Sequence, residues 1–390
     1  MDTHDAGLAG LGAGRRAFDR PAFDRYAAMP RAAARAVLAV LAAFLVLAAF
    51  APGYAPPPPD PPKVTVTDRS GHQVTKVEDN DLRLYRLINE RLARGDNYYV
   101  AATEEQRAHN YPVAPGLTVR LPTLAFVSVA LGSTGLLALE MTLFAAMILA
   151  NARRLGEMPG GAGRRPLALA LLTAGVASGL GERYTMIHEV WAGLLIALAF
   201  GLHRPEAGRW GAAWLAAAAA LAVRELALPF VLLMAAWALW HRRWREGAAW
   251  LGLVVLFGAA LMVHLHLAEA QIRPGDPASP SWLALKGISG LMYKVNNCTL
   301  LSLVPVWLSG PLIVLALFGW TGWRTPMGDF AALLTFGYAV AFAIAGRDNN
   351  FYWGIVITPL LFMGAAFLPI ALPSLWRAAG LRRPREPALA

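Results

Sequence analysis

The sequence predicts an all-α integral membrane protein with about ten transmembrane helices. Two observations support this fold class. Hydrophobic residues make up 57% of the 390 residues and charged residues only 15%, well below the roughly one quarter found in soluble domains. Apolar runs recur along the chain, and several approach the ~20 residues that a helix needs to cross a bilayer. A single cysteine, Cys298, excludes an intrachain disulfide framework, CxxC redox chemistry and thiolate metal clusters.

Residues 1–35 form an arginine-containing leader, and the apolar run Ala36–Ala51 follows it. This run fits either an uncleaved first span or the apolar part of a signal peptide with a weak cleavage site at Gly53-Tyr54-Ala55. The length of the leader and the proline after Ala55 favour the span. Pro56–Pro62 predicts a stiff polyproline II spacer that lifts the next segment off the bilayer.

The predicted outer loop 52–121 is the long polar stretch of the chain, and it contains an amphipathic helix over residues 82–94. Leu82, Tyr85, Ile88 and Leu92 share one face at helical spacing, charged residues cover the rest, and Gly95 ends the helix. We expect this helix to lie on the outer membrane surface, because its apolar stripe is too narrow to build a core alone.

Residues 36–373 are predicted to form one polytopic membrane domain, followed by a tail over residues 374–390. Several of its apolar runs are short, so tilted or partly inserted helices are expected. After the first span, the runs are Pro122–Ala150, Pro166–Leu180, Val190–Leu202, Trp210–Val223, Leu226–Trp240, Ala248–Leu267, Leu300–Phe318, Phe330–Ala345 and Tyr352–Pro373.

The distribution of Lys and Arg gives the orientation. With the N-terminus inside, arginines gather in the leader, in the connections at 153–165, 204–209 and 242–245, and in the tail, whereas the short connections on the other side hold few. Both termini are therefore predicted to be cytoplasmic. The net charge of +10 follows from this topology and does not imply a nucleic-acid partner. Richness in Ala, Leu, Gly and Arg is typical of a GC-rich bacterial genome, which favours the bacterial inner (plasma) membrane.

This orientation brings acidic residues at the ends of spans to the outer side. They are Asp79, Asp81, Glu182, Glu189, Glu225 and Asp348. Ionisable groups at membrane depth are costly and usually face a cavity or a partner, so we expect one polar cavity that opens outward to the periplasm. The pair Arg224-Glu225 is the only charged sequence that we expect near the middle of the membrane.

Asp79 and Asp81 open the amphipathic helix, and either carboxylate could act as a general base in the cavity. The alternative is a helix cap, and the two roles are compatible because a side chain at a helix start is held in place. A calcium loop would lack its downstream ligands. Arg120 precedes the second span and is either an interfacial anchor or a ligand for a lipid phosphate, which a guanidinium can bind through two oxygens.

Three further clusters are candidates for substrate binding: His188-Glu189, Arg224-Glu225, and Arg347 with Tyr352. The first begins a helix, where a carboxylate is favoured, although a lone histidine at a helix end is often only an interfacial residue. The second is either a structural ion pair or part of the cavity. The third joins a charge to an aromatic belt, and contact with phosphate or sugar is the alternative to a plain membrane anchor.

The order of these motifs resembles the GT-C class of polyprenyl-phosphate-dependent glycosyltransferases, which contains the protein O-mannosyltransferases and the aminoarabinose transferases that modify lipid A. In that class the first outer loop carries an acidic motif, then a tyrosine and an amphipathic helix, as Asp81 and Tyr85 do here. A basic residue and a Pro-rich turn before the next span are similar to Arg120-Leu121-Pro122. Arg and Tyr before a helix broken by proline are similar to Arg347, Tyr352 and Pro359, in the last outer loop.

The resemblance implies that Asp81 is the catalytic base and that Arg120 binds the donor phosphate. The chain departs from the class in three ways: Leu82 rather than a second acid follows Asp81, arginine replaces the more usual lysine at position 120, and no soluble domain follows the last span. The choice of base between Asp79 and Asp81 therefore stays open.

The expected function is transfer of a sugar from a polyprenyl-phosphate donor to a lipid, glycan or protein acceptor at the outer face of the inner membrane, with inversion at the anomeric carbon. The sequence requires no cofactor, and it leaves open a divalent metal near Asp79, Asp81 and Glu189. The alternative is a transporter or lipid flippase with an outward-facing polar cavity, which predicts an inverted internal repeat that we do not find. A non-catalytic assembly protein is a third interpretation.

Overall fold

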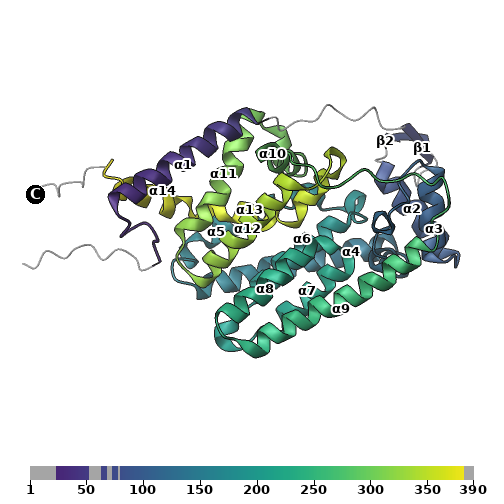
Figure 1. Ribbon diagram of the computed structural model, residues 1–390, viewed down its shortest axis with the longest axis horizontal. Coiled ribbons are helices and arrows are strands. Elements are labelled where there is room, and N and C mark those ends of the chain that lie inside the picture. The colour runs from purple at the N-terminus through teal and green to yellow at the C-terminus, as the bar shows by residue number, and fades with distance from the viewer. Residues whose placement is uncertain (1–22, 52–62, 68–72, 78–79, 382–390) are drawn as a thin grey trace, which may run out of the picture.

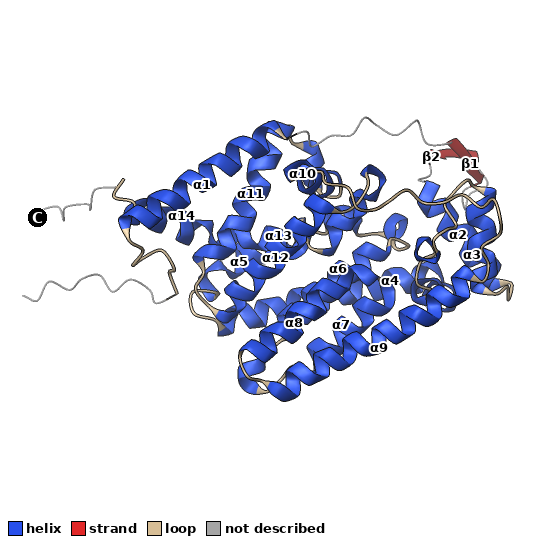
Figure 2. Ribbon diagram, viewed as in Figure 1, coloured by secondary structure: helices blue, strands red, loops and turns tan. Residues whose placement is uncertain are grey.

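A computed structural model describes residues 23–51, 63–67, 73–77 and 80–381. The described chain is predominantly helical, as predicted, with one small antiparallel sheet (Figures 1 and 2). Its strands are β1 (Lys63–Thr67) and β2 (Gln73–Val77). The helices are α1 (Arg31–Phe50), α2 (Asn80–Ala93), α3 (Tyr98–Ala108), α4 (Thr123–Glu157), α5 (Arg165–Ala174), α6 (His188–Leu202), α7 (Gly211–Val223), α8 (Leu228–Trp240), α9 (Trp244–Glu269), α10 (Ile288–Asn297), α11 (Val306–Gly322), α12 (Pro326–Ile344), α13 (Thr358–Met363) and α14 (Leu368–Ala378).

Five helical segments are long and apolar enough to cross a membrane, as expected for a membrane protein. They are Arg31–Phe50, Gly116–Glu157, Trp244–Glu269, Pro326–Ile344 and Thr358–Ala378. Shorter apolar helices lie at His188–Leu202, Gly211–Val223, Glu225–Trp240 and Val306–Gly322. Every apolar run predicted as a span is therefore helical over most of its length, while the number of spans stays a prediction.

The boundaries of the predicted membrane domain differ from those of the helices. Helix α1 begins at Arg31, inside the predicted leader, and α14 continues to Ala378, past the predicted end at residue 373. The polyproline spacer lies outside the described residues. The longest helix, α4, is bent at Gly132, where φ is 65°, a backbone conformation that glycine adopts at little cost.

The first apolar run belongs to the helical core. Helix α1 packs on α11 and α14, and its residues Leu41 and Ala48 are buried. Gly310 of α11 meets the carbonyl oxygen of Ala48 so closely that a Cβ at position 310 would overlap it. Small residues allow two helix backbones to approach, which is a common way for helices to associate in membranes.

The segment predicted as a long outer loop folds into a cap at one end of the molecule, at the right in Figure 1. The predicted amphipathic helix 82–94 corresponds to α2, but it is buried on two sides rather than one. Leu82 and Tyr85 pack against the main core, while Leu84 and Ile88 join a second apolar cluster with α3 and α9. Helix α2 is therefore held between α3 and the long helices, and α3 itself was not predicted.

Arg224-Glu225 was expected to be the only charged sequence near the middle of the membrane, and this expectation was wrong. Glu140 lies near the middle of α4 and is fully buried. Its Oε2 accepts a hydrogen bond of 3.2 Å from the backbone N–H of Gly181. Lys294 of α10 is also fully buried. Charged residues inside otherwise apolar helices are easily missed when spans are read from runs of hydropathy.

Candidate active site

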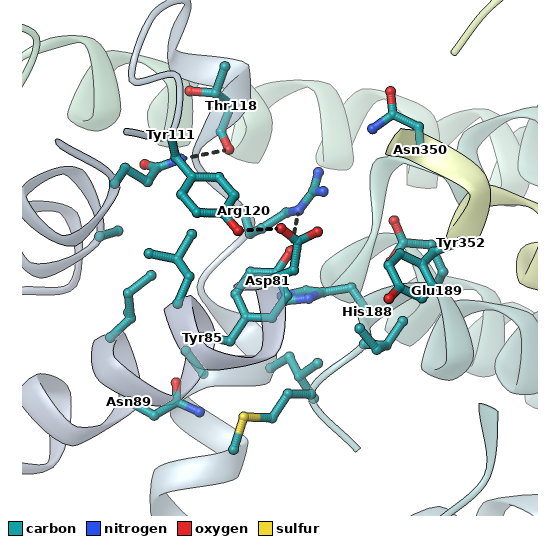
Figure 3. A pocket seen from close by; sticks show the side chains of 18 of the residues that line it. Asp81, Tyr85, Asn89, Tyr111, Thr118, Arg120, His188, Glu189, Asn350 and Tyr352 are labelled. Carbon is teal, nitrogen blue, oxygen red and sulfur yellow. Dashed lines mark hydrogen bonds between the residues drawn. The ribbon is translucent and has the colours of Figure 1, made fainter. Parts of the chain in front are cut away.

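A polar cavity of about 110 Å³ lies between the cap and the ends of the long helices (Figure 3). Six stretches of the chain contribute its walls: α2, α3, the segment 111–128, the start of α6, and the segments around Trp282 and Arg347–Trp353. Of the residues singled out from the sequence, the structure brings seven to this cavity: Asp81, Tyr85, Arg120, His188, Glu189, Arg347 and Tyr352.

Asp81 lies in the first turn of α2 and points into the cavity (Figure 3). The Tyr111 hydroxyl donates a hydrogen bond of 2.8 Å to its Oδ1. Asp79, the other candidate for the base, lies outside the described residues. The helix thus holds Asp81 by its backbone and Tyr111 orients its carboxylate, as a positioned proton acceptor requires.

Arg120 reaches the cavity from the segment that leads into α4. Its Nε donates to the Tyr85 hydroxyl at 3.1 Å, and no ion pair joins it to a carboxylate of the described residues. The Tyr98 hydroxyl donates to the backbone oxygen of Arg120 at 2.8 Å, and His264 Nε2 lies 3.1 Å from the neighbouring carbonyl oxygen of Val119. The backbone that carries Arg120 is therefore fixed by two helices.

Tyr85 stays protonated beside this arginine. Burial raises the pKa of Tyr85, and the charge of Arg120 opposes that rise only in part. The Tyr85 ring also contacts His188 edge-on, with the ring centroids 5.2 Å apart. Its hydroxyl accepts a hydrogen bond from Arg120 and keeps its own proton to donate to a ligand.

Arg347 lines the cavity from the segment that follows α12. Its guanidinium lies over the Trp282 ring, 5.3 Å from the centroid, and its backbone N–H donates to Asn350 Oδ1 at 3.1 Å. Its Nε is buried without a hydrogen-bond partner among the described residues, as is Nε1 of Trp353. Burial and the positive charge of Arg120 both lower the pKa of Arg347, so the two arginines are close enough to repel each other.

The predicted binding residues Arg224 and Glu225 do not line the cavity. Arg224 is 1% exposed and lies behind Glu189, whose Oε1 accepts a hydrogen bond of 2.9 Å from its Nε. Arg224 also forms an ion pair with Glu225. The structural ion pair is thus the better interpretation of Arg224-Glu225, because the guanidinium faces Glu189 rather than the cavity.

His188 and Glu189 form the first turn of α6, as predicted, and both are buried. Neither ring nitrogen of His188 has a hydrogen-bond partner of ordinary geometry among the described residues. Within those residues, no group of three His, Cys, Asp or Glu side chains is arranged to hold a metal ion.

Sequence reasoning missed part of this cavity. The polar lining residues that it did not single out include Asn89, Gln106, Tyr111, Thr118, Ser128 and Trp282. No charge or motif marks them, and Tyr111, Thr118 and Trp282 sit outside the α-helices, in segments without periodicity. The one available signal was that Tyr111 and Thr118 belong to the long polar stretch that also contains Asp81.

A second cavity, of about 360 Å³, lies between α1, α10, α11 and α12 and is apolar. One segment contributes to both cavities, since Trp282 lines the polar cavity and Gly287 the apolar one, and the backbone of residues 282–287 pairs with that of residues 343–346. Its lining includes Val37, Leu41, Phe44, Leu291, Leu317 and Phe336.

Comparison of this chain with protein-family models, with curated proteins and with solved structures finds no match. The interpretation of the cavity therefore depends on its own residues.

Proposed function

We propose that this protein is a membrane glycosyltransferase that moves a sugar from a polyprenyl-phosphate donor to an acceptor at the outer face of the bacterial inner membrane, with inversion at the anomeric carbon. One observation carries the proposal: one cavity is lined by Asp81 and by two arginines, Arg120 and Arg347, that form no ion pair with a carboxylate of the described residues. A proton acceptor and a site for an anionic leaving group are the two parts that this reaction needs.

The arginine pair supports an anionic ligand. Both arginines are half-buried, and two like charges that face one cavity repel each other. An anion between Arg120 and Arg347 would relieve this repulsion, and a guanidinium binds phosphate through two parallel hydrogen bonds. The unpartnered Nε of Arg347 and Nε1 of Trp353 supply further donors at the same wall.

The reaction follows as a single displacement. Asp81 takes the proton from the acceptor hydroxyl or amine as its oxygen or nitrogen forms a bond to the anomeric carbon. The bond between that carbon and the phosphate oxygen breaks, and its electron pair stays on the phosphate, where the two arginines stabilise the new charge. Attack from the side opposite the leaving group inverts the anomeric configuration.

The apolar cavity between α1, α10, α11 and α12 supports a lipid-linked donor. An isoprenoid chain needs an apolar surface close to the site that holds its phosphate, and the segment 282–287 runs from the lining of the polar cavity to that of the apolar one. A nucleotide-sugar donor would have no use for such a surface.

The proposed location requires about ten spans with both termini in the cytoplasm. In a Cys298→Ser background, single cysteines at positions 68 and 347 should then react with an impermeant thiol reagent outside intact cells, and cysteines at 161 and 385 only after the membrane is opened. Labelling of position 161 from outside would reject this orientation and with it a periplasmic active site.

The function is tested by incubating the purified protein with radiolabelled polyprenyl-phosphate sugars and membrane extracts that contain acceptors. Release of polyprenyl phosphate together with label in the acceptor is the expected result. A transporter or flippase would move the lipid across a vesicle membrane without breaking the bond to the sugar, which would exclude the transferase.

A further inference from the structure

We infer that the end of the cavity formed by Gln106, Tyr111 and Thr118 binds the hydroxyl groups of the donor's sugar, and that this sugar is uncharged. The inference depends on the proposed function and adds to it the class of sugar. In Figure 3, Tyr111 and Thr118 lie on one side of Asp81, and His188, Glu189 and Tyr352 lie on the other. The labelled lining residues therefore form two groups, one on each side of Asp81.

Gln106 provides a hydrogen-bond acceptor at this end. The residue is 6% exposed, and its Nε2 donates to the carbonyl oxygens of Pro112 at 3.2 Å and of Thr118 at 3.3 Å. Only the nitrogen of the amide can donate to two carbonyl oxygens, so these bonds fix the orientation of the side chain. The remaining atom, Oε1, is buried with no partner among the described residues, and a sugar hydroxyl would satisfy it.

Thr118 provides a hydroxyl beside it. Its Oγ1 is also buried without a partner among the described residues. The backbone at Thr118 is fixed, because its N–H donates to the carbonyl oxygen of Pro115 at 2.9 Å and its carbonyl oxygen accepts from Gln106. Two unsatisfied groups on rigid supports are costly in an empty cavity, and both are of the kind that hydroxyl groups satisfy.

Buried apolar side chains wall this end of the cavity. Leu84, Ile88, Tyr98 and Ala102 line the cavity and belong to the apolar cluster between α2, α3 and α9. An acceptor is one group of a lipid, glycan or protein, so the rest of that molecule must extend out of the cavity. An enclosed end does not allow this. The sugar of the donor ends in its own ring and can be enclosed.

The charges of the cavity select against an ionised sugar. The charged lining residues are Asp81, Arg120, Glu189 and Arg347, and Asp81 meets this end through the hydrogen bond that it accepts from Tyr111. A carboxylate on the ring would be repelled by Asp81, and an ammonium would pair with Asp81 and weaken it as a base. Neutral hydroxyls meet neutral partners, so a neutral hexose is the expected class.

The test uses Thr118→Val, which keeps the shape of the side chain and removes only the hydroxyl. Purified full-length protein is assayed with a polyprenyl-phosphate donor that carries a neutral hexose, and with donors that carry its deoxy analogues. For the wild type, removing one particular hydroxyl from the donor should lower kcat/KM by about 10-fold or more, because the hydroxyl of Thr118 is left unsatisfied. Thr118→Val should lose a similar factor with the full hexose and no longer distinguish that deoxy donor.

Thr118→Ser restores the hydroxyl and should restore the discrimination, which separates binding from a folding defect. Thr142→Val is the matched control, since the Thr142 hydroxyl is on the exposed face of α4 and bonds the carbonyl oxygen of Ala138 at 2.7 Å. Unchanged discrimination in Thr118→Val, or a wild-type preference for an amino or acidic sugar, would overturn the inference and leave the proposed transferase intact. No transfer from any lipid-linked sugar would overturn both.

Discussion

The replacement Asp81→Asn separates the transferase from the alternatives most directly. Asparagine has the size of aspartate and retains an oxygen that can accept the hydrogen bond from the Tyr111 hydroxyl, which measures 2.8 Å in the wild type. The start of α2 should therefore keep its structure. The amide cannot take a proton from the acceptor, so the change removes the base and little else.

General base catalysis contributes roughly 100- to 10,000-fold, so transfer by Asp81→Asn should fall by at least about 100-fold, which is about 2.7 kcal/mol in the barrier. The assay is release of polyprenyl phosphate from the labelled donor. Tyr111→Phe, which removes a hydrogen bond to the carboxylate and one hydroxyl from the sugar end but keeps the base, should cost much less. Asp96→Asn is a matched control, because Asp96 bonds Arg91 at 2.7 Å outside the cavity.

The outcome that would refute this reasoning is full activity in both Asp79→Asn and Asp81→Asn. Activity lost in Asp79→Asn alone would move the base by two positions and leave the arginine site unchanged. An assembly protein would tolerate both substitutions in every assay of its cellular role.

Two further predictions concern stability. Arg224→Met removes the partner of the buried Glu189 carboxylate, so thermal unfolding in detergent should show that the free energy of unfolding falls by about 3 kcal/mol. Adding Glu189→Gln should recover much of this loss. Additive losses in the double variant would mean that the pair is not coupled. The bond from Arg107 lowers the pKa of Asp276 from 3.8 to about 2, so the contact between α3 and the segment after α9 is fully present above pH 4 and is lost as the pH falls towards 2. Hydrogen exchange of residues 273–281 should rise over that range, whereas Asp276→Asn should show high exchange already at pH 5.

The helices were predictable because their signal is local. Apolar runs marked each long helix, and the spacing of Leu82, Tyr85 and Ile88 marked α2. Helix α3 begins at Tyr98, after Asn97, whose Oδ1 caps it by accepting from the backbone N–H of Tyr99 and Val100, but its mixed residues give no apolar stripe. Its helical state depends on packing against α2 and α9, which no local pattern reports.

Residues of the site were predictable where a charge distinguished them from an apolar sequence. They were unpredictable where only the three-dimensional arrangement of the chain brings them to the cavity. Asp81, Arg120 and Arg347 stand out in an apolar chain, and the structure brings all three to one cavity. Arg224 carries the same charge but points at Glu189. The difference comes from the backbone at the end of α7, and a sequence that shows only spacing cannot say which way a buried guanidinium points. Gln106 and Thr118 carry no charge at all, and only their missing hydrogen-bond partners reveal them.

Two arginines match the negative charge of the product of the proposed reaction better than that of the donor. A polyprenyl-phosphate sugar is a phosphodiester with one negative charge, and the departing polyprenyl phosphate is a monoester with close to two at neutral pH. One of the two guanidiniums, Arg120 or Arg347, is thus unmatched in the ground state and becomes matched as the bond breaks. Interactions that strengthen on the way to the transition state raise kcat, whereas those present throughout only lower KM.

The substitution Arg347→Gln should therefore lower kcat more than it raises KM. Arg120→Lys keeps the charge but loses the bidentate contact, so it should retain more activity than Arg120→Ala. Arg273→Gln is the control, because the Arg273 side chain is 62% exposed and bonds Glu104 outside the cavity. A rise in KM with unchanged kcat for Arg347→Gln would mean that both arginines already hold the donor equally well before reaction. The arginine pair would then be a binding site only, and the barrier would have to fall by means of Asp81 alone.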